Sequence, residues 1–417
     1  MSAHAVDVLS TSNARRQRVL VAAAQLTALS CWFSASAVAP SVAEQFHLSS
    51  SMSVLLTSSV QIGFVLGSVL SAAINLADRF DPAKVVAACA FAAAVLTALI
   101  PALPGSPVLI LAARLLTGVA LAGVYPVNMK IMASWSPPRT RATSFGILIG
   151  ALTLGSAVPQ LFRGVEGLPW QGVMLGAAGL TLVGAGIAAF CLRAGPEVGG
   201  RPGRLSPRYA ITMFADRGPR LANLGYFGHM WELYAWWTWL PSFVVASEVA
   251  SGREVTGATS LVAFAAIGLA GLAGCLIGGV AADWMGRSRA AVTALVASGG
   301  CCAVSPFFFG RPLVLLVPFL LVWGAAVIAD SGVFSTVLSE TADPRYVGTA
   351  LTAQTAIGFL LTVATIHLVP VIAAWTSWQW AFLILAAGPI VGATAMGRFG
   401  RPSLAPRRGR FPGQPSS

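Results

Sequence analysis

Two short segments of similar composition decide how this chain folds: Ala77-Asp78-Arg79-Phe80-Asp81-Pro82-Ala83-Lys84 and Ala282-Asp283-Trp284-Met285-Gly286-Arg287-Ser288-Arg289. Each segment places an acid, a base and a turn-forming residue between two long stretches with almost no charge. Positions 78 and 283 are 205 residues apart, and the Pro-Arg pairs at 138–139 and 344–345 are 206 apart. Two landmarks with nearly the same offset indicate a duplicated unit, so the sequence predicts two similar halves.

The composition indicates a membrane protein. Of the 417 residues, 56% are hydrophobic and 10% are charged, whereas soluble domains carry about 25% charged residues. The apolar runs are continuous rather than alternating, which favours helices over a β-barrel. A spanning helix needs about 20 residues, and the sequence predicts twelve: 18–40, 52–76, 84–103, 106–132, 142–162, 170–193, 220–246, 257–282, 289–309, 312–338, 347–369 and 376–397.

These spans divide the chain into five parts and predict an all-α membrane protein with two pseudo-symmetric six-helix bundles. The bundles are 18–193 and 220–397, joined by a linker, 194–219, that is rich in Gly, Pro and Arg. We expect an N-terminal tail, 1–17, and a basic C-terminal tail, 398–417. The first apolar run is too long for a cleaved signal peptide, so we expect an uncleaved first helix.

The basic residues are unevenly distributed along the chain. This distribution accounts for the net charge of +12 without a nucleic-acid-binding function. The linker, the tails and every second loop carry nearly all Lys and Arg, and the opposite side has only Arg163, Arg253 and Arg311. This asymmetry places both termini in the cytoplasm and brings the basic residues to anionic lipid. The six cysteines all lie in predicted spans without metal-ligand spacing, so the sequence predicts neither a metal site nor a disulfide.

Polar and aromatic side chains form stripes on the first, fourth, seventh and tenth helices. On each helix, at about 100° per residue, the stripe occupies one side. Ionisable groups at bilayer depth tend to face a cavity or a partner because burying them is costly. We therefore predict a central cavity whose solute and proton pathway is lined by nine side chains: Gln25, Trp32, Arg114, Tyr125, Asn128, His229, Glu232, Trp236 and Asp330.

The charged members of this set admit several roles. Glu232 lies about 18 Å into its helix, near the bilayer centre, where it could bind and release a proton and share it with His229. Alternatively it forms a structural pair with His229 or Arg114. Arg114 could bind a solute carboxylate, because its fork suits such groups, or neutralise Glu232. Asp330 is either a coupling site or a gate contact, and the tryptophans either stack on solute or pack the cavity.

Over residues 18–397 the sequence resembles the major facilitator superfamily, and it is broadly similar to the cyanate/nitrate-related bacterial branch of that family. The family's loop signature, Gly-x-x-x-Asp-Arg-x-Gly-Arg, is matched by Gly279 to Arg287 except that Trp284 replaces the basic residue, and the first copy keeps Asp78-Arg79. Arg114-x-x-x-Gly118 resembles the family's fourth-helix motif. The resemblance implies a bacterial cytoplasmic membrane and cytoplasmic gating loops that contain Asp78, Arg79, Asp283, Gly286 and Arg287.

The resemblance predicts a secondary transporter that works by alternating access, coupled to protons. We expect a small organic solute, anionic given Arg114, no cofactor beyond an ion gradient, and a functional monomer. An efflux carrier for drugs or metabolites is the alternative, although helix 5 lacks the antiporter ending Gly-Pro-x-Gly-Gly. Gln61 stands in helix 2, where nitrate carriers use arginine. A membrane sensor or membrane-embedded enzyme is a weaker alternative, because the four histidines are scattered and no soluble domain is added.

Overall fold

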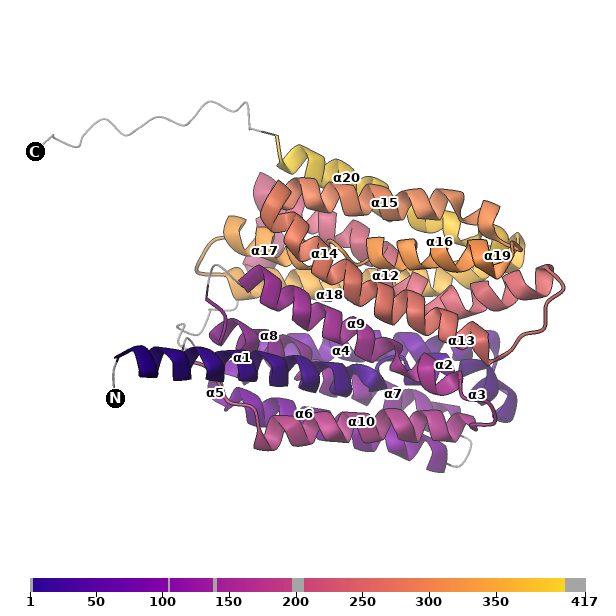
Figure 1. Ribbon diagram of the computed structural model, residues 1–417, viewed down its shortest axis with the longest axis horizontal. Helices are drawn as coiled ribbons and strands as arrows, with labels where there is room; N and C mark the ends of the chain where they lie inside the picture. The colour runs from indigo at the N-terminus through magenta and orange to yellow at the C-terminus, as the bar shows by residue number, and fades with distance from the viewer. Residues whose placement is uncertain (1–2, 104–105, 138–140, 197–205, 402–417) are drawn as a thin grey trace, which may run out of the picture.

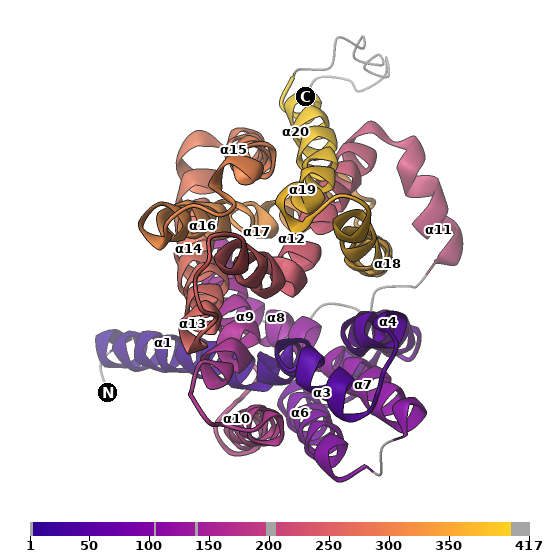
Figure 2. The same cartoon turned by 90° about the vertical axis from the view of Figure 1, so that its right-hand side faces the viewer.

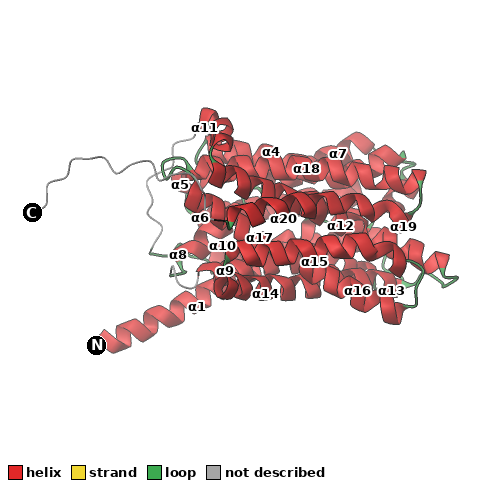
Figure 3. Ribbon diagram, turned by 90° about the horizontal axis from the view of Figure 1, so that it is seen from above, coloured by secondary structure: helices red, strands yellow, loops and turns green. Residues whose placement is uncertain are grey.

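The computed structural model describes residues 3–103, 106–137, 141–196 and 206–401, and in these ranges it contains helices and loops only (Figure 3). Helix occupies each of the twelve predicted spans. The first half comprises α1 (Ala3–Ala28), η1 (Leu29–Cys31), α2 (Ser34–Ala37), α3 (Ala39–Gln45), α4 (Ser50–Ala73), α5 (Leu76–Arg79), α6 (Pro82–Leu99), η2 (Ile100–Ala102), α7 (Pro107–Leu121), α8 (Tyr125–Ser134), α9 (Arg141–Arg163) and α10 (Trp170–Phe190).

The second half follows a short linker that contains α11 (Pro207–Thr212) and η4 (Met213–Ala215). It comprises α12 (Arg217–Ala250), α13 (Gly257–Phe264), the π-helical turn η5 (Ala265–Leu269), α14 (Ala270–Met285), α15 (Arg287–Phe308), α16 (Leu313–Ala326), α17 (Ser331–Thr341), α18 (Val347–Trp375), α19 (Trp378–Ala381), η6 (Phe382–Ala386) and α20 (Ala387–Phe399). The halves lie side by side as two bundles with roughly parallel long helices (Figures 1 and 2).

Ten of the described helical segments are long and apolar enough to cross a membrane by length and composition. The two remaining predicted spans are the first and the seventh. The first is interrupted between Leu29 and Phe33, so its apolar part is divided. The seventh, α12, is continuous over 34 residues, but its polar and aromatic side chains lower its mean hydropathy. Both exceptions therefore belong to the stripe-bearing helices.

The spans are not all continuous, a feature that the twelve predicted ranges did not include. Helix 1 breaks at η1, helix 4 breaks between Leu121 and Tyr125, and helix 10 breaks between Ala326 and Ser331. These three occupy equivalent places in a three-helix repeat, as their polar stripes do. Hydropathy indicates whether a segment lies in the bilayer, not whether its backbone is a regular helix. Helix breaks inside the protein are tolerated where other groups hydrogen-bond to the freed carbonyl oxygens.

Glycine contacts show that the two halves share one register. A Cβ on Gly118 would collide with the carbonyl oxygen of Val60, and a Cβ on Gly324 would collide with the carbonyl oxygen of Ala266. Positions 118 and 324, and positions 60 and 266, are each 206 apart. Thus helices 2 and 4 meet as helices 8 and 10 do, by close backbone approach at small residues. This contact gives the sequence repeat a structural counterpart.

The termini and the linker depart from the expected domain boundaries in detail. Helix α1 begins at Ala3, so most of the expected tail 1–17 is helical, and it starts at the same end of the molecule as α20 ends (Figure 1). We call this the inner end. The linker docks on the second half there, where the backbone N–H of Asp343 donates to the Tyr209 hydroxyl at 2.7 Å. Residues 402–417 of the predicted basic tail lie outside the described residues.

Candidate transport pathway

A vestibule of about 780 Å³ lies between the two halves at the end opposite the inner end. We call that end the outer end; α2, α3, α13 and α19 lie there in Figure 1. The lining is rich in hydroxyl and other polar side chains from both halves: Ser36, Ser53, Thr57, Gln160, Arg163, Glu166, Thr238, Trp239, Ser242, Thr256, Thr259 and Ser260. A solute entering here would meet both bundles at once, as a carrier that works between two halves requires.

An aromatic layer lies deeper than this lining, within about two helical turns of it. It consists of six rings, three from each half: Trp32, Phe33, Phe64, Tyr234, Trp237 and Phe359. The ring centroids of Phe64 and Phe359 are 4.6 Å apart, and those of Trp32 and Phe359 are 5.6 Å apart. Such separations are typical of packed aromatic pairs. Because these pairs cross the boundary between the halves, the aromatic layer joins the bundles beneath the vestibule.

Two buried polar pairs lie on the inner side of the aromatic layer, one in each half. In the first half the Asn128 amide donates to the Gln25 carbonyl oxygen at 2.8 Å. In the second half His229 Nδ1 lies 2.8 Å from Asp330 Oδ1, and the other ring nitrogen lies 2.8 Å from the Ser331 hydroxyl. Each pair links the first and fourth helices of its half. The predicted stripes therefore meet in pairs, one neutral and one ionisable.

Arg114 is fully buried on α7 and holds the break of helix 1. Its guanidinium donates to the carbonyl oxygens of Cys31 at 3.1 Å and Trp32 at 2.6 Å. It also donates to the Ser34 hydroxyl and, through Nε, to the Leu56 carbonyl oxygen, both at 3.3 Å. Sequence reasoning missed these backbone partners. The break in helix 1 leaves carbonyl oxygens without helical donors, and the Arg114 guanidinium donates to those of Cys31 and Trp32.

Glu232 is buried on α12 within the second half, and its partners also differ from those considered from sequence. One carboxyl oxygen accepts from the Trp323 indole at 2.8 Å and from the Cys302 thiol at 3.2 Å. The other accepts from the Ser298 hydroxyl at 2.9 Å. All three donors are neutral, so neither Arg114 nor His229 is brought to this carboxyl. Ser298 and Cys302 stand four residues apart on α15, a spacing that places them on one face.

The remaining pathway candidates are placed differently. Trp236 is fully buried beside Trp323, with centroids 5.5 Å apart, so it belongs to the packing around Glu232. Tyr125 begins α8 just after the break of helix 4 and is partly buried against the main apolar core. Neither residue lines the vestibule. In this structure Trp32 belongs to the aromatic layer, and the other predicted pathway residues lie deeper or inside a bundle.

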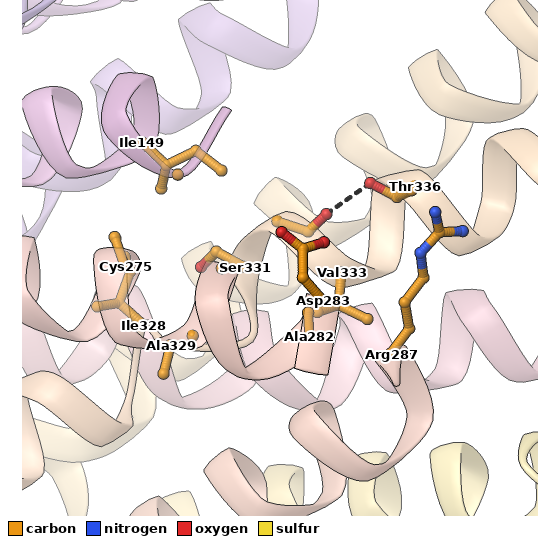
Figure 4. A pocket seen from close by; sticks show the side chains of 14 residues that line it. Ile149, Cys275, Ala282, Asp283, Arg287, Ile328, Ala329, Ser331, Val333 and Thr336 are labelled. Carbon is orange, nitrogen blue, oxygen red and sulfur yellow. Dashed lines mark hydrogen bonds between the residues drawn. The ribbon is translucent and has the colours of Figure 1, made fainter. Parts of the chain in front are cut away.

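The second loop copy lines a small pocket at the inner end (Figure 4). Asp283 and Arg287 contribute to it together with Ile149 of α9 in the first half and Thr336 of α17. Arg287 forms an ion pair with Glu340, which is also in the second half. Gly286 has a φ of +86° at the turn between α14 and α15, a conformation that favours glycine.

The first loop copy differs from the second. Arg79 ends α5 and is exposed, while the side chain of Asp78 lies outside the described part of the chain. In the loop between helices 10 and 11, Arg345 donates to Asp343 at 2.7 Å and lowers the pKa of that carboxyl to about 2. The gating role that the resemblance implies for these loops stays a prediction, because the ion pair of Arg287 lies within the second half.

Comparisons with known proteins agree with this architecture. A family model described as Major Facilitator Superfamily matches residues 20–366. The structure of the proton:xylose symporter XylE superimposes with a TM-score of 0.74 over 94% of this chain and 96% of that one, at 15% identity. The predicted twelve-helix, two-bundle fold is thereby confirmed.

Two curated relatives are named as transporters. A probable sulfoacetate transporter, SauU, of Cupriavidus necator is 24% identical over 309 residues, 66% of this chain and 67% of that protein. A probable chloroplastic anion transporter 2 of Oryza sativa subsp. japonica is 35% identical over 120 residues, which are 28% of this chain. That match spans only 22% of the rice protein, well under two thirds of its length.

Proposed function

Because the chain belongs to the Major Facilitator Superfamily, we propose that it is a secondary transporter that moves a small organic anion by alternating access, coupled to protons. The observation that carries this proposal is the vestibule between two pseudo-symmetric bundles, with the aromatic layer joining the bundles beneath it. A pathway open at one end and blocked further in is one of the two states that alternating access requires. Rocking of the bundles would open the inner end in turn.

The anionic class of the solute is supported by the relatives named above, one for sulfoacetate and one for anions in general. The vestibule supports it too, since its hydroxyl groups can donate to carboxylate or sulfonate oxygens and its Arg163 is exposed there. We therefore propose short carboxylates and sulfonates as solutes.

The charge asymmetry supports a defined orientation. We propose that the inner end faces the cytoplasm of a bacterium, with both termini there, and that the vestibule faces outward. The chain would work as a monomer in the lipid of the cytoplasmic membrane, because one chain supplies both bundles. Its energy would come from an ion gradient, without a cofactor and without enzymatic chemistry.

Glu232 is our candidate for the proton site. It is a buried carboxyl at bilayer depth, and its three observed donors are a hydroxyl, a thiol and an indole N–H, none of which carries a positive charge. Burying a carboxylate without a compensating cation is costly. A proton can neutralise this group, and releasing that proton at the other side would couple the gradient to the movement of the bundles.

The test is uptake of radiolabelled sulfoacetate into proteoliposomes, with and without an inwardly directed proton gradient. The wild type should accumulate solute faster with the gradient. Glu232→Gln should still exchange solute across the membrane but lose the acceleration by the gradient. Glu248→Gln is the matched control, since Glu248 is a buried carboxyl on the same helix that accepts a hydrogen bond from Thr259. Full gradient dependence in Glu232→Gln would remove Glu232 from the coupling mechanism.

A further inference from the structure

One face of α4 runs from the vestibule to the aromatic layer. Ser53 and Thr57 line the vestibule, and Phe64 belongs to the aromatic layer. Gln61 stands one turn after Thr57 and three residues before Phe64, a spacing that keeps all four residues on one side of the helix. Gln61 therefore lies between the deepest part of the vestibule lining and the rings, on the face that α4 turns to the other half.

The Gln61 side chain is fully buried, and neither its amide nitrogen nor its carbonyl oxygen has a hydrogen-bond partner within the described part of the chain. The indole nitrogen of Trp32 shares this condition, with the residue 2% exposed. The ring centroids of Trp32 and Phe64 are 4.9 Å apart, and Gln61 precedes Phe64 by three residues on α4, which places both side chains beside Phe64. Leaving a buried polar group without a hydrogen-bond partner is unfavourable, and a bound solute that pairs with it would remove that cost.

We propose that Gln61 and Trp32 form the solute-binding site at the base of the vestibule, where their N–H groups donate to the carboxylate or sulfonate oxygens of an anion. This assignment rests on the transport function proposed above. Arg114 does not compete for that role, because its guanidinium is held by the carbonyl oxygens of helix 1 and by Leu56. The anion is thus recognised by neutral donors rather than by a paired cation.

Neutral donors fit the task of a carrier. A guanidinium paired with an anion in a dry site would hold it strongly, whereas amide and indole donors bind more weakly and release it. The Gln61 carbonyl oxygen adds an acceptor for a hydroxyl or a protonated group on the same solute. A glutamine amide also discriminates by geometry, since an apolar residue of similar size offers neither donor nor acceptor.

Thermal-shift titration of the purified full-length protein tests this assignment, with sulfoacetate, succinate and xylose as probes. The wild type should be stabilised by at least one of the two anions. Gln61→Leu should weaken that binding about ten-fold or more, equivalent to about 1.4 kcal/mol. Trp32→Phe, which keeps a ring and removes the N–H, should weaken it in the same direction. The unliganded melting temperature of Gln61→Leu should equal or exceed that of the wild type, because an unsatisfied amide is removed.

Ser58→Ala is the matched control, because Ser58 is a buried polar residue of α4 whose hydroxyl donates to the Val54 carbonyl oxygen of its own helix. Its anion affinity should equal that of the wild type. Unchanged affinity in both Gln61→Leu and Trp32→Phe would overturn the site while leaving the anion-transport function standing. A wild-type protein that binds neither anion would instead overturn the anion class, and the site with it.

Discussion

At the scale of single residues, the role of each buried polar side chain depends on the hydrogen-bond donors and acceptors that surround it. The sequence left open that Arg114 neutralises Glu232, because both charged residues are predicted to lie at bilayer depth. In the structure one is held by backbone carbonyl oxygens and the other by three neutral donors. Charge alone did not select their partners, because the break in helix 1 offers acceptors that an intact helix would not.

Arg114→Lys should lower the stability of the protein. A lysine ammonium cannot reproduce the fork that donates to Cys31 and Trp32 together, so at least one buried carbonyl would lose its donor. The expected loss is about 1–3 kcal/mol, measured as a lower denaturation midpoint in mild detergent. Arg163→Gln, a change at an exposed arginine of the vestibule, should leave the midpoint unchanged. A midpoint for Arg114→Lys equal to the wild type would contradict the structural role.

The sequence predicted part of the site at this scale. Helical periodicity placed Gln25, Asn128, His229 and Asp330 on facing stripes, and the structure brings them together as two pairs. It could not predict the partners of Glu232, because Ser298 and Cys302 have no feature that separates them from ordinary small residues in a span. From sequence, Gln61 is only a glutamine where nitrate carriers use arginine. That its side-chain amide lacks hydrogen-bond partners among the described residues is known only once its neighbours are placed.

At the scale of elements, the close contacts between helices are set by small residues. Helices 2 and 4, and helices 8 and 10, meet where a glycine lies against a backbone carbonyl group, at equivalent positions of the two halves. The broken helices were not predicted, because the apolar span of helix 4 and that of helix 10 each continue through the break.

Gly324→Ala and Gly118→Ala should destabilise the protein to a similar extent. Each added methyl group would meet a backbone carbonyl oxygen that cannot move without shifting a helix. We expect a loss of about 1–3 kcal/mol for each, measured by thermal unfolding of the purified protein. Gly179→Ala on α10 has open space around it and should be neutral or stabilising. If the two test variants were as stable as Gly179→Ala, the contact shared by the two halves would contribute nothing to stability.

At the scale of the whole molecule, the vestibule and the inner pocket mark opposite ends of the boundary between the halves. The repeat and the charge asymmetry predicted two bundles and an orientation, and the two-bundle fold is confirmed. Neither signal could predict which end is open, since the same sequence must adopt both states of the cycle. That difference depends on how the bundles pack in a given state.

Sidedness can be measured with a membrane-impermeant thiol reagent. Ser53→Cys, in the vestibule, should react from outside intact cells, whereas Ala282→Cys, in the inner pocket, should react only in inside-out vesicles. The wild type gives the background, because four of its six cysteines are buried. Labelling of Ala282→Cys from outside intact cells would reverse the proposed orientation.

The hydrogen bonds that fix Arg114 to helix 1 also bear on the charge that is transported. Because these contacts fix Arg114 in the protein, its charge is not carried across with the solute, and only the accompanying protons balance the charge of the solute. A monovalent anion moving with one proton is then electroneutral, and its flux should not respond to membrane voltage. A dianion with one proton carries one net negative charge, which entering a negative cell interior costs about 2.3 kcal/mol per 100 mV. Valinomycin-clamped potentials in proteoliposomes would therefore reveal the stoichiometry of transport.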